Sequence, residues 1–278
     1  MRIIDFERME TTLEVSQRKF AEAKPFPHIV VDDFLETEAC DVLLEEFEHL
    51  TDDKEWSRYS HYNERKRALT RAERMGLGTK SIIAELSSPR FLAWLEAVSE
   101  IHGLVADPDL DGGGLHQIER GGYLNIHADY LSHTVHSNWS RQINLLLFLN
   151  RNWREEYKGA LEFWDSDMTR KVEQIEPLFN RCIVFHTTDK TYHGHPTPLD
   201  CPEGMSRKSL ALYYFRDEKK KLRLAPTHYR ARPEETAWKH TLVAVDREAL
   251  RAYSVLKRYT GLRDRHFSAV VRAFRKGR

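Results

Sequence analysis

The chain has 278 residues, of which 41% are hydrophobic and 31% are charged, a composition typical of a soluble globular protein with one large or two small domains. Lys and Arg together number 43 and so do Asp and Glu, so no overall basic field favours nucleic acid as a partner. We find no apolar run long enough to span a bilayer and no apolar signal core near the N-terminus. The cysteines form no CxxC pair, which fits a reducing compartment. We therefore expect a cytoplasmic protein that binds neither nucleic acid nor membranes.

The first part of the chain, residues 1–111, is expected to form helices and a lead-in strand of the same domain as the residues that follow. Apolar side chains at helical spacing predict helices that begin near residues 9, 36 and 88, and the β-branched run 28–34 predicts a short strand. In the charged segment 51–80, apolar residues recur at neither the helical nor the strand spacing. We predict that it is a solvated surface segment, with a substrate lid as the alternative.

From Gly112 onward, short apolar segments separated by Gly, Asn and Asp predict a sandwich or barrel of β-strands. The apolar runs 143–149 and 182–185 are expected to be central strands that are buried on both faces. The predicted strands are 114–119, 123–128, 141–149, 159–164, 171–175, 181–186, 190–194 and 207–216. The core of the domain is accordingly residues 112–220.

The remaining part, residues 221–278, is expected to be a helical C-terminal extension. A polar segment leaves the sheet, and apolar stripes then predict helices at 246–260 and 263–275. The last of these stretches is basic. We interpret its charges as a solvated helix face in preference to contact with phosphate or an acidic partner.

Two histidines and an aspartate in the core form the pattern of a mononuclear iron site. His127 and Asp129 are two residues apart on a predicted strand, so their side chains share one face. The predicted third ligand is His193, and His195 competes with it, although Pro196 indicates that the strand stops before His195. Two imidazoles and one carboxylate can hold Fe(II) on one face of an octahedron and leave the opposite face open for an oxidant and a co-substrate. Weaker candidate ligands are His133, His136 and His186.

A basic residue opens the last predicted strand of the core. Arg207 shares a face with Ser209, Ala211 and Tyr213, and its guanidinium could hold a dicarboxylate such as 2-oxoglutarate through a bidentate pair. The alternative is a surface ion pair at the start of a strand. Asn144, a polar residue inside an apolar run, is a candidate for a hydrogen bond to the co-substrate or for a structural network. Gln117 is a similar candidate for lining the site.

Several blocks of sequence, in the same order, resemble the 2-oxoglutarate and Fe(II)-dependent oxygenases, specifically the prolyl-4-hydroxylase-like branch. Together they span about residues 114–216, and residues 25–35 resemble the lead-in strand and helix of this branch. The blocks are Gly-Gly-Tyr-Leu-Asn-Ile-His-Ala-Asp-Tyr (121–130), Arg-Gln-Ile-Asn-Leu-Leu-Leu-Phe-Leu-Asn-Arg-Asn-Trp (141–153), Gly-Ala-Leu-Glu-Phe-Trp-Asp (159–165), Phe-Asn-Arg-Cys-Ile-Val-Phe (179–185), and His193 followed by Arg207-Lys-Ser-Leu-Ala-Leu-Tyr-Tyr-Phe.

This resemblance implies an α+β fold that is mainly β, with a double-stranded β-helix (jelly-roll) core and buttressing N-terminal helices. It implies that His127, Asp129 and His193 are the catalytic iron ligands and that Arg207 binds the carboxylate of 2-oxoglutarate. The implied cofactors are Fe(II), 2-oxoglutarate and O2, with ascorbate as a reductant.

The chain departs from the family pattern at two places. Phe148 stands where many prolyl hydroxylases have a tyrosine, and Ile118-Glu-Arg-Gly replaces the usual Tyr-x-x-Gly ahead of the histidine. A tyrosine hydroxyl that would contact the co-substrate is therefore missing. We expect its hydrogen bond to come from Asn144 or Gln117.

The resemblance implies an oxygenase that hydroxylates an unactivated C–H bond and releases succinate and CO2. We expect a small-molecule substrate, such as an amino acid or a biosynthetic or polysaccharide intermediate. The alternatives are a peptidyl hydroxylase that modifies a protein and a non-catalytic jelly roll that binds a metal. Side chains that we expect to line the substrate pocket are Tyr130, Phe148 and Tyr213, with Trp139 and Phe163 as further aromatic candidates.

Overall fold

The strand β7 (Trp139–Phe148) shows how the sequence pattern gives the sheet two different faces. Ile143, Leu145 and Leu147 belong to the largest core cluster, whereas Leu146 and Phe148 pack into other clusters on the opposite face. Both faces of the strand are buried, as predicted for the apolar run 143–149, because successive side chains of a strand point to opposite faces. The structure is a computed structural model that describes residues 2–222 and 227–260.

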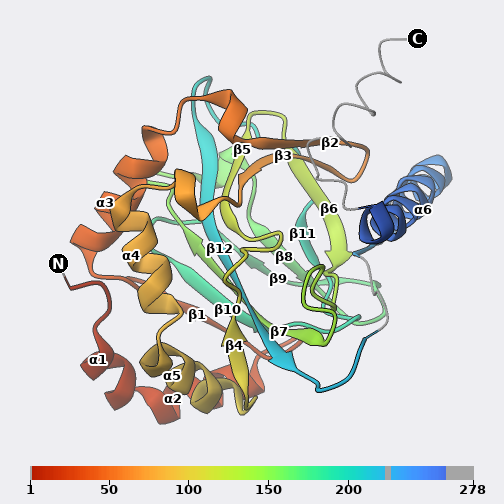
Figure 1. The fold of residues 1–278 in the computed structure, drawn as a ribbon. Helices are drawn as coiled ribbons and strands as arrows, with labels where there is room; N and C mark the ends of the chain where they lie inside the picture. Colours follow the sequence, from red (N-terminus) through yellow and green to blue (C-terminus); the bar gives the residue numbers. More distant parts are fainter. Residues whose placement is uncertain (1, 223–226, 261–278) are drawn as a thin grey trace.

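The N-terminal helices cover the outer face of the sheet. They gather on one side of the molecule, opposite α6 (Ala237–Thr260) (Figure 1). Phe20, Leu43 and Phe91 from these helices share one core cluster with the outer side chains of β7. The helices are α1 (Phe6–Thr11), α2 (Leu13–Glu22), α3 (Thr37–Glu48), α4 (Leu77–Leu86) and α5 (Pro89–Ser99), with 3-10 turns at Asp53–Glu55, Ala72–Arg74 and Glu155–Tyr157.

The strands form one long, antiparallel sheet that curls back on itself. In the order of its strands, β8 and β10 are far apart, yet Phe163 of β8 and Phe185 of β10 have ring centroids only 5.4 Å apart. The inner face is therefore enclosed, and the predicted double-stranded β-helix core is confirmed. The order is β1 (His28–Val31), β10 (Cys182–His186), β7, β12 (Ser206–Asp217), β5 (Gly114–Glu119), β3 (Glu64–Leu69), β6 (Tyr123–Ala128), β11 (His193–His195), β8 (Leu161–Trp164) and β9 (Lys171–Ile175), with β2 (Ser57–Ser60), β4 (Leu104–Ala106) and β13 (His228–Tyr229) paired to β3, β12 and β6.

The prediction of a solvated surface segment at residues 51–80 is wrong. β2 and β3 form a hairpin there, and β3 pairs with both β5 and β6, so it closes the sheet between them. Asn63, Glu64 and Leu69 are buried. The sequence of β3 shows no alternation of apolar and polar residues, because some of the side chains on its inner face are charged. A hydropathy pattern predicts such residues to be exposed to solvent.

The secondary structure of the C-terminal extension differs from the prediction. The stretch 227–235, which looks irregular in the sequence, contains β13, and one helix, α6, begins well before residue 246. The predicted helix at 263–275 lies outside the described residues. None of the described helices is both long enough and apolar enough to cross a bilayer.

We expect Asn180→Ala to lower the free energy of unfolding by about 2–4 kcal/mol, because two buried backbone groups would lose their partner. The Asn180 side chain is 1% exposed, accepts a hydrogen bond from the Leu35 N–H (3.0 Å) and donates one to the Leu35 carbonyl (2.8 Å). Urea unfolding measures the change. Asn152→Ala is the matched control, since Asn152 is exposed and both asparagines have a positive φ, 55° and 58°. Equal losses in the two variants would contradict the role of the side-chain bonds.

Candidate metal centre

The pairing of β6 with β11 brings two predicted ligands together. His127 and His193 are direct antiparallel partners, and their ring centroids are 4.5 Å apart. Between them and His195 the register shifts, and Gly194 sits where an added Cβ would lie 2.8 Å from the carbonyl oxygens of both Leu124 and Asn125. Only glycine allows β6 and β11 to approach so closely at this point.

The two imidazoles are held by the same kind of contact. Nδ1 of His127 lies 2.9 Å from the Asn125 carbonyl and Nδ1 of His193 lies 3.0 Å from the Thr191 carbonyl. A carbonyl accepts only, so Nδ1 carries a proton in each ring, and Nε2 is the atom that holds the lone pair when the ring is neutral. Burial lowers the pKa of His193 to about 4, against the opposing charge of Asp129, so this ring is neutral at physiological pH. Both Nε2 atoms are therefore available to a metal ion.

The Asp129 carboxylate completes the group. Its oxygens lie 3.5 Å from Nε2 of His127 and 3.4 Å from Nε2 of His193, and one ligand atom from each residue lies within 4.8 Å of the others. Burial alone would raise the pKa of Asp129, but the Arg141 charge, followed by the two histidines, lowers it well below its usual range. The carboxylate is thus ionised, as a metal ligand must be.

Arg141 and Asn144 hold this carboxylate from behind, and Arg141 is a site residue that we did not predict. Oδ2 of Asp129 accepts from Nδ2 of Asn144 (2.7 Å) and pairs with Nη2 of Arg141 (3.1 Å). The Arg141 guanidinium is 2% exposed and lies 3.3 Å from the Tyr213 ring centroid and 4.8 Å from that of Tyr130. Both tyrosine hydroxyls donate to backbone carbonyls, so these two predicted pocket residues clamp Arg141.

Arg207 is buried on the inner face, so it is not a surface ion pair at the start of a strand. Its Nε donates to the Gly159 carbonyl (2.8 Å), and its guanidinium lies over the Phe148 ring at 4.7 Å. Among the described residues, no carboxylate lies within 4.0 Å of the guanidinium, and the charge of Glu176 opposes the effect of burial on its pKa. Burial lowers the pKa of Arg207 to about 9, so the group remains a cation at neutral pH. A buried cation without a close counter-ion is a place for an anionic ligand.

The two amides that we expected near the co-substrate have other partners. Gln117 is the cross-strand partner of Lys208, so it lies on the face opposite to Arg207, where it accepts from Arg67 and donates to Ser206. Asn144 is on the inner face, but its amide accepts from Arg141 and donates to Asp129. Neither amide therefore contacts the Arg207 guanidinium. Phe148, expected in the substrate pocket, lies instead beneath Arg207.

The prediction that the strand stops before His195 is wrong. β11 runs from His193 to His195, so both rings lie on the inner face, and Pro196 follows the last paired residue. His195 is 2% exposed, and neither ring nitrogen has a hydrogen-bond partner among the described residues. Burial, together with the charges of Arg207 and Lys66, lowers the pKa of His195 well below its usual range.

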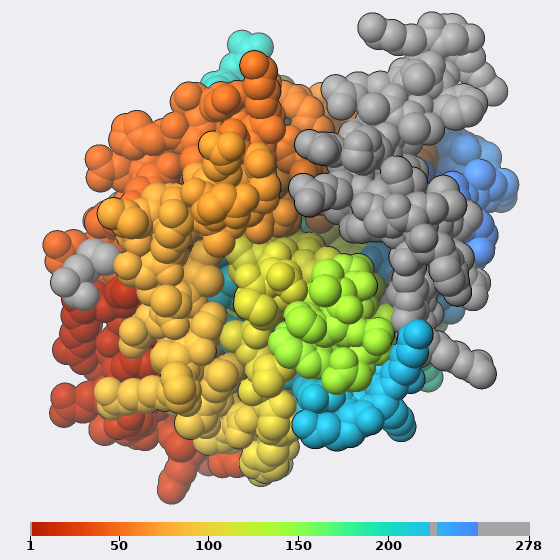
Figure 2. Space-filling model, viewed as in Figure 1, coloured from red at the N-terminus to blue at the C-terminus, as the bar shows by residue number. Residues whose placement is uncertain are grey.

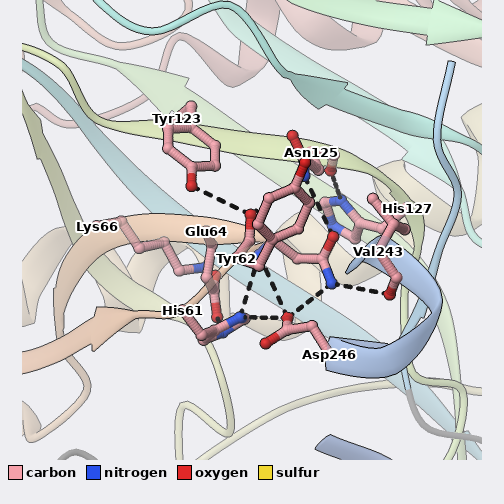
Figure 3. Close-up of polar contacts among 10 residues, drawn as sticks. His61, Tyr62, Glu64, Lys66, Tyr123, Asn125, His127, Val243 and Asp246 are labelled. Carbon is pink, nitrogen blue, oxygen red and sulfur yellow. Dashed lines mark hydrogen bonds and ion pairs between the residues drawn. The ribbon is translucent and has the colours of Figure 1, made fainter. Parts of the chain in front are cut away.

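A hydrogen-bond chain links the C-terminal helix to His127 of the candidate metal centre (Figure 3). Asp246 of α6 accepts from Nδ2 of Asn63 (2.7 Å), whose Oδ1 accepts from Nδ2 of Asn125 (3.2 Å). The carbonyl of Asn125 in turn accepts from His127. Tyr229 of β13 pairs with His127 in register, and the two ring centroids are 5.3 Å apart. β13 and α6 thus buttress the side of the metal centre formed by β6.

The hairpin contributes a buried charge cluster beside this chain (Figure 3). His61 contacts Glu64 through Nε2 (2.8 Å) and Asp246 through Nδ1 (2.7 Å), and Lys66 pairs with Glu64 (3.0 Å). Burial alone would lower the pKa of His61, but its bonds to Asp246 and Glu64 raise it to about 9. His61 therefore bridges two carboxylates as a cation at neutral pH.

A second group of ligand-type side chains serves a loop. Asp109, His133 and His136 also place ligand atoms within 4.8 Å of one another. However, Nδ1 of His133 accepts from the N–H groups of Val135 and His136, and Nε2 contacts Asp107 at 3.1 Å. Both nitrogens are used, so His133 has no lone pair for a metal. These bonds hold the loop near residue 135 against the segment near residue 110, as their adjacent light green and yellow atoms show (Figure 2).

Comparison with known proteins identifies a family with the same pattern. The model of the 2OG-Fe(II) oxygenase superfamily matches residues 113–215. No curated protein matches the chain. Similar solved structures include a prolyl hydroxylase from Trichoplax adhaerens in complex with a hypoxia inducible factor peptide fragment (17% identity, TM-score 0.56, 77% of this chain and 94% of that chain covered). Others are a Pseudomonas putida prolyl-4-hydroxylase (14%, 0.51, 73% and 99%) and a prolyl 4-hydroxylase from Phytophthora capsici (19%, 0.51, 91% and 76%). At these identities the similarity is one of fold.

We expect the stability of the fold to fall as the pH rises through about 9, because His61 then loses its charge. Its pKa is raised on folding from 6.5, so the stabilisation is complete below about pH 6.5 and amounts to at most about 3 kcal/mol. The measurement is the free energy of unfolding in urea between about pH 6.5 and pH 9.5.

His61→Gln should remove this step, whereas His102→Gln should retain it, since the His102 side chain is 80% exposed. The difference between wild type and His61→Gln cancels the titration of other groups. A difference that stays constant over this pH range would contradict the assignment.

Proposed function

We propose that His127, Asp129 and His193 bind Fe(II) and that Arg207 binds 2-oxoglutarate, since residues 113–215 match the model of the 2OG-Fe(II) oxygenase superfamily. The protein is a 2-oxoglutarate-dependent dioxygenase that uses Fe(II), 2-oxoglutarate and O2. The observation that carries the residue assignment is the convergence of two Nε2 lone pairs and one ionised carboxylate at one buried point.

The donor set suits ferrous iron. Two neutral imidazoles and a carboxylate form the facial arrangement of non-haem oxygenases and leave coordination positions open. The Nδ1–carbonyl bonds orient both rings, and Asn144 and Arg141 orient the carboxylate, as outer contacts do around metal ligands. Asp129 is 12% exposed in its side chain, so bulk water has little access to the centre.

The surroundings of Arg207 suit a dicarboxylate. Its guanidinium is a buried cation, and Phe148, Phe163 and Phe185 form one apolar cluster that reaches from Arg207 to His193. Two methylenes of a bound 2-oxoglutarate would lie against such a surface. When bound, iron and 2-oxoglutarate supply the O2-dependent hydroxylation of a C–H bond, with loss of succinate and CO2. This chain's own residues hold the ligands, orient the carboxylates and exclude water.

We further propose that the substrate is a small molecule. Support comes from the enclosure of the centre: the side chains of His127 and His193 are each 6% exposed, and β13 with Tyr229 lies along β6 beside His127. A compact substrate can enter such a site without a long open groove. We propose as well that residues 112–220 are the catalytic core and that residues 1–111 and 221–278 support it.

Asp129→Ala and His193→Ala should each reduce Fe(II)-dependent turnover of 2-oxoglutarate to background, because a facial site with one ligand missing cannot hold the metal in a reactive geometry. Succinate release in the presence of Fe(II) and ascorbate measures turnover. His102→Ala, a change at an exposed histidine, should retain it, and thermal unfolding should confirm that every variant is folded. Full activity in folded Asp129→Ala would refute the assignment.

Arg207→Ala should chiefly raise the 2-oxoglutarate concentration needed for half-maximal turnover, by about 100-fold or more, because a charge-assisted bidentate contact is lost. Steady-state kinetics with varied 2-oxoglutarate separate this effect from a change in the maximal rate. An unchanged 2-oxoglutarate requirement would remove Arg207 from the site.

The substrate class is tested by stimulation of succinate release. We expect a pool of small metabolites to raise the rate above the uncoupled background and peptide pools to leave it there. Stimulation by peptides alone would instead establish a peptidyl hydroxylase. The hydroxylated product, found by a mass increase of one oxygen atom, identifies the substrate.

A further inference from the structure

One imidazole on the inner face has no partner at all among the described residues. His195 is 2% exposed, and both of its ring nitrogens are buried without a hydrogen bond. His127 and His193, on the same paired strands, each bond a backbone carbonyl through Nδ1. Buried polar groups are rarely left unpaired in native proteins, so a group without a partner indicates a ligand that the fold expects.

The position of His195 relates it to Arg207. β11 pairs with β8 in antiparallel fashion, with Gly194 opposite Glu162. His195 therefore lies beside the first residue of β8. Nε of Arg207 donates a hydrogen bond to the carbonyl of Gly159 (2.8 Å), which lies two residues before the start of β8. Arg207 is also the charge that acts most strongly on the His195 ring. The two side chains therefore approach the same point from β11 and β12.

His195 also lies on the metal side of this point. It follows His193 by two residues on the same face of β11. The apolar cluster that contains Phe148 and Phe163 connects the surroundings of His193 with those of Arg207. An elongated dicarboxylate that reaches from the metal centre to Arg207 along this cluster would end beside His195.

We propose that His195 donates a hydrogen bond to the distal carboxylate of 2-oxoglutarate, together with Arg207. It would supply the contact that a tyrosine hydroxyl could make and that Phe148 cannot. Asn144 and Gln117 do not compete for this role, because their amides already have partners at other places. The inference rests on the proposed assignment of Arg207 to the same carboxylate.

The test is direct binding without turnover, measured on the full chain loaded with Fe(II) under anaerobic conditions. The two probes are 2-oxoglutarate and 2-oxovalerate, which has the same 2-oxo acid head and a methyl group in place of the distal carboxylate. Binding is followed by calorimetry and by the visible absorption that a 2-oxo acid gains when it chelates Fe(II). The variants are His195→Phe and His195→Leu, which remove both nitrogens, with Gln117→Leu as the control.

We expect both His195 variants to bind 2-oxoglutarate about 10- to 100-fold more weakly, the loss of one hydrogen bond to a charged group, and to bind 2-oxovalerate as wild type does. Unchanged 2-oxovalerate binding also shows that a variant is folded. Gln117→Leu should match wild type with both probes. Equal weakening for both probes, or no weakening for 2-oxoglutarate, would overturn the inference.

The result is distinguishable from a failure of the proposed function. Wild type that binds no 2-oxoglutarate, or Arg207→Gln that binds it as wild type does, would sink the assignment of the site itself. Wild type that depends on Arg207 but not on His195 would sink only the role of His195.

Discussion

The antiparallel pairing of β6 with β11 is the constraint on which the rest of the structure depends. It places His127 opposite His193, and the carbonyls two residues before each histidine fix which ring nitrogen carries the proton. The two imidazoles are thus oriented by main-chain groups, which vary little with the side chains around them. The curled sheet supplies the remaining parts, since β7 and β12 face this pair and bring Asn144 and Arg207 to the same interior.

Some buried charges of the interior have a close counter-ion, and others do not. Asp129 has Arg141 beside it, and Glu64 lies between His61 and Lys66, so these buried charges compensate one another. Among the described residues, Arg207 has no carboxylate within 4.0 Å of its guanidinium. A buried cation without a close counter-ion is a position that suits an anion from solution.

The strands and the shared face of His127 and Asp129 could be predicted from the sequence because both depend on local spacing. Alternation along β7 and the two-residue interval between His127 and Asp129 determine which side chains share a face. Arg141 could not be predicted, since its contact with Asp129 crosses strands and leaves no periodic signal. β3 could not be predicted either, because its inner face carries charged residues whose ion pairs become visible only in the folded structure. Pro196 does not end the strand before His195, because a proline after the last paired residue breaks no ladder bond.

Gly194 gives the site a property that extends beyond its own position. With no Cβ between the strands, the separation of the two histidine positions is determined by backbone against backbone at Leu124 and Asn125. No side chain stands between the two strands at this contact, so the spacing of His127 and His193 does not depend on the size of a side chain there. Any side chain at position 194 would push β6 and β11 apart and so separate the two imidazoles, which makes this glycine the position that controls their distance.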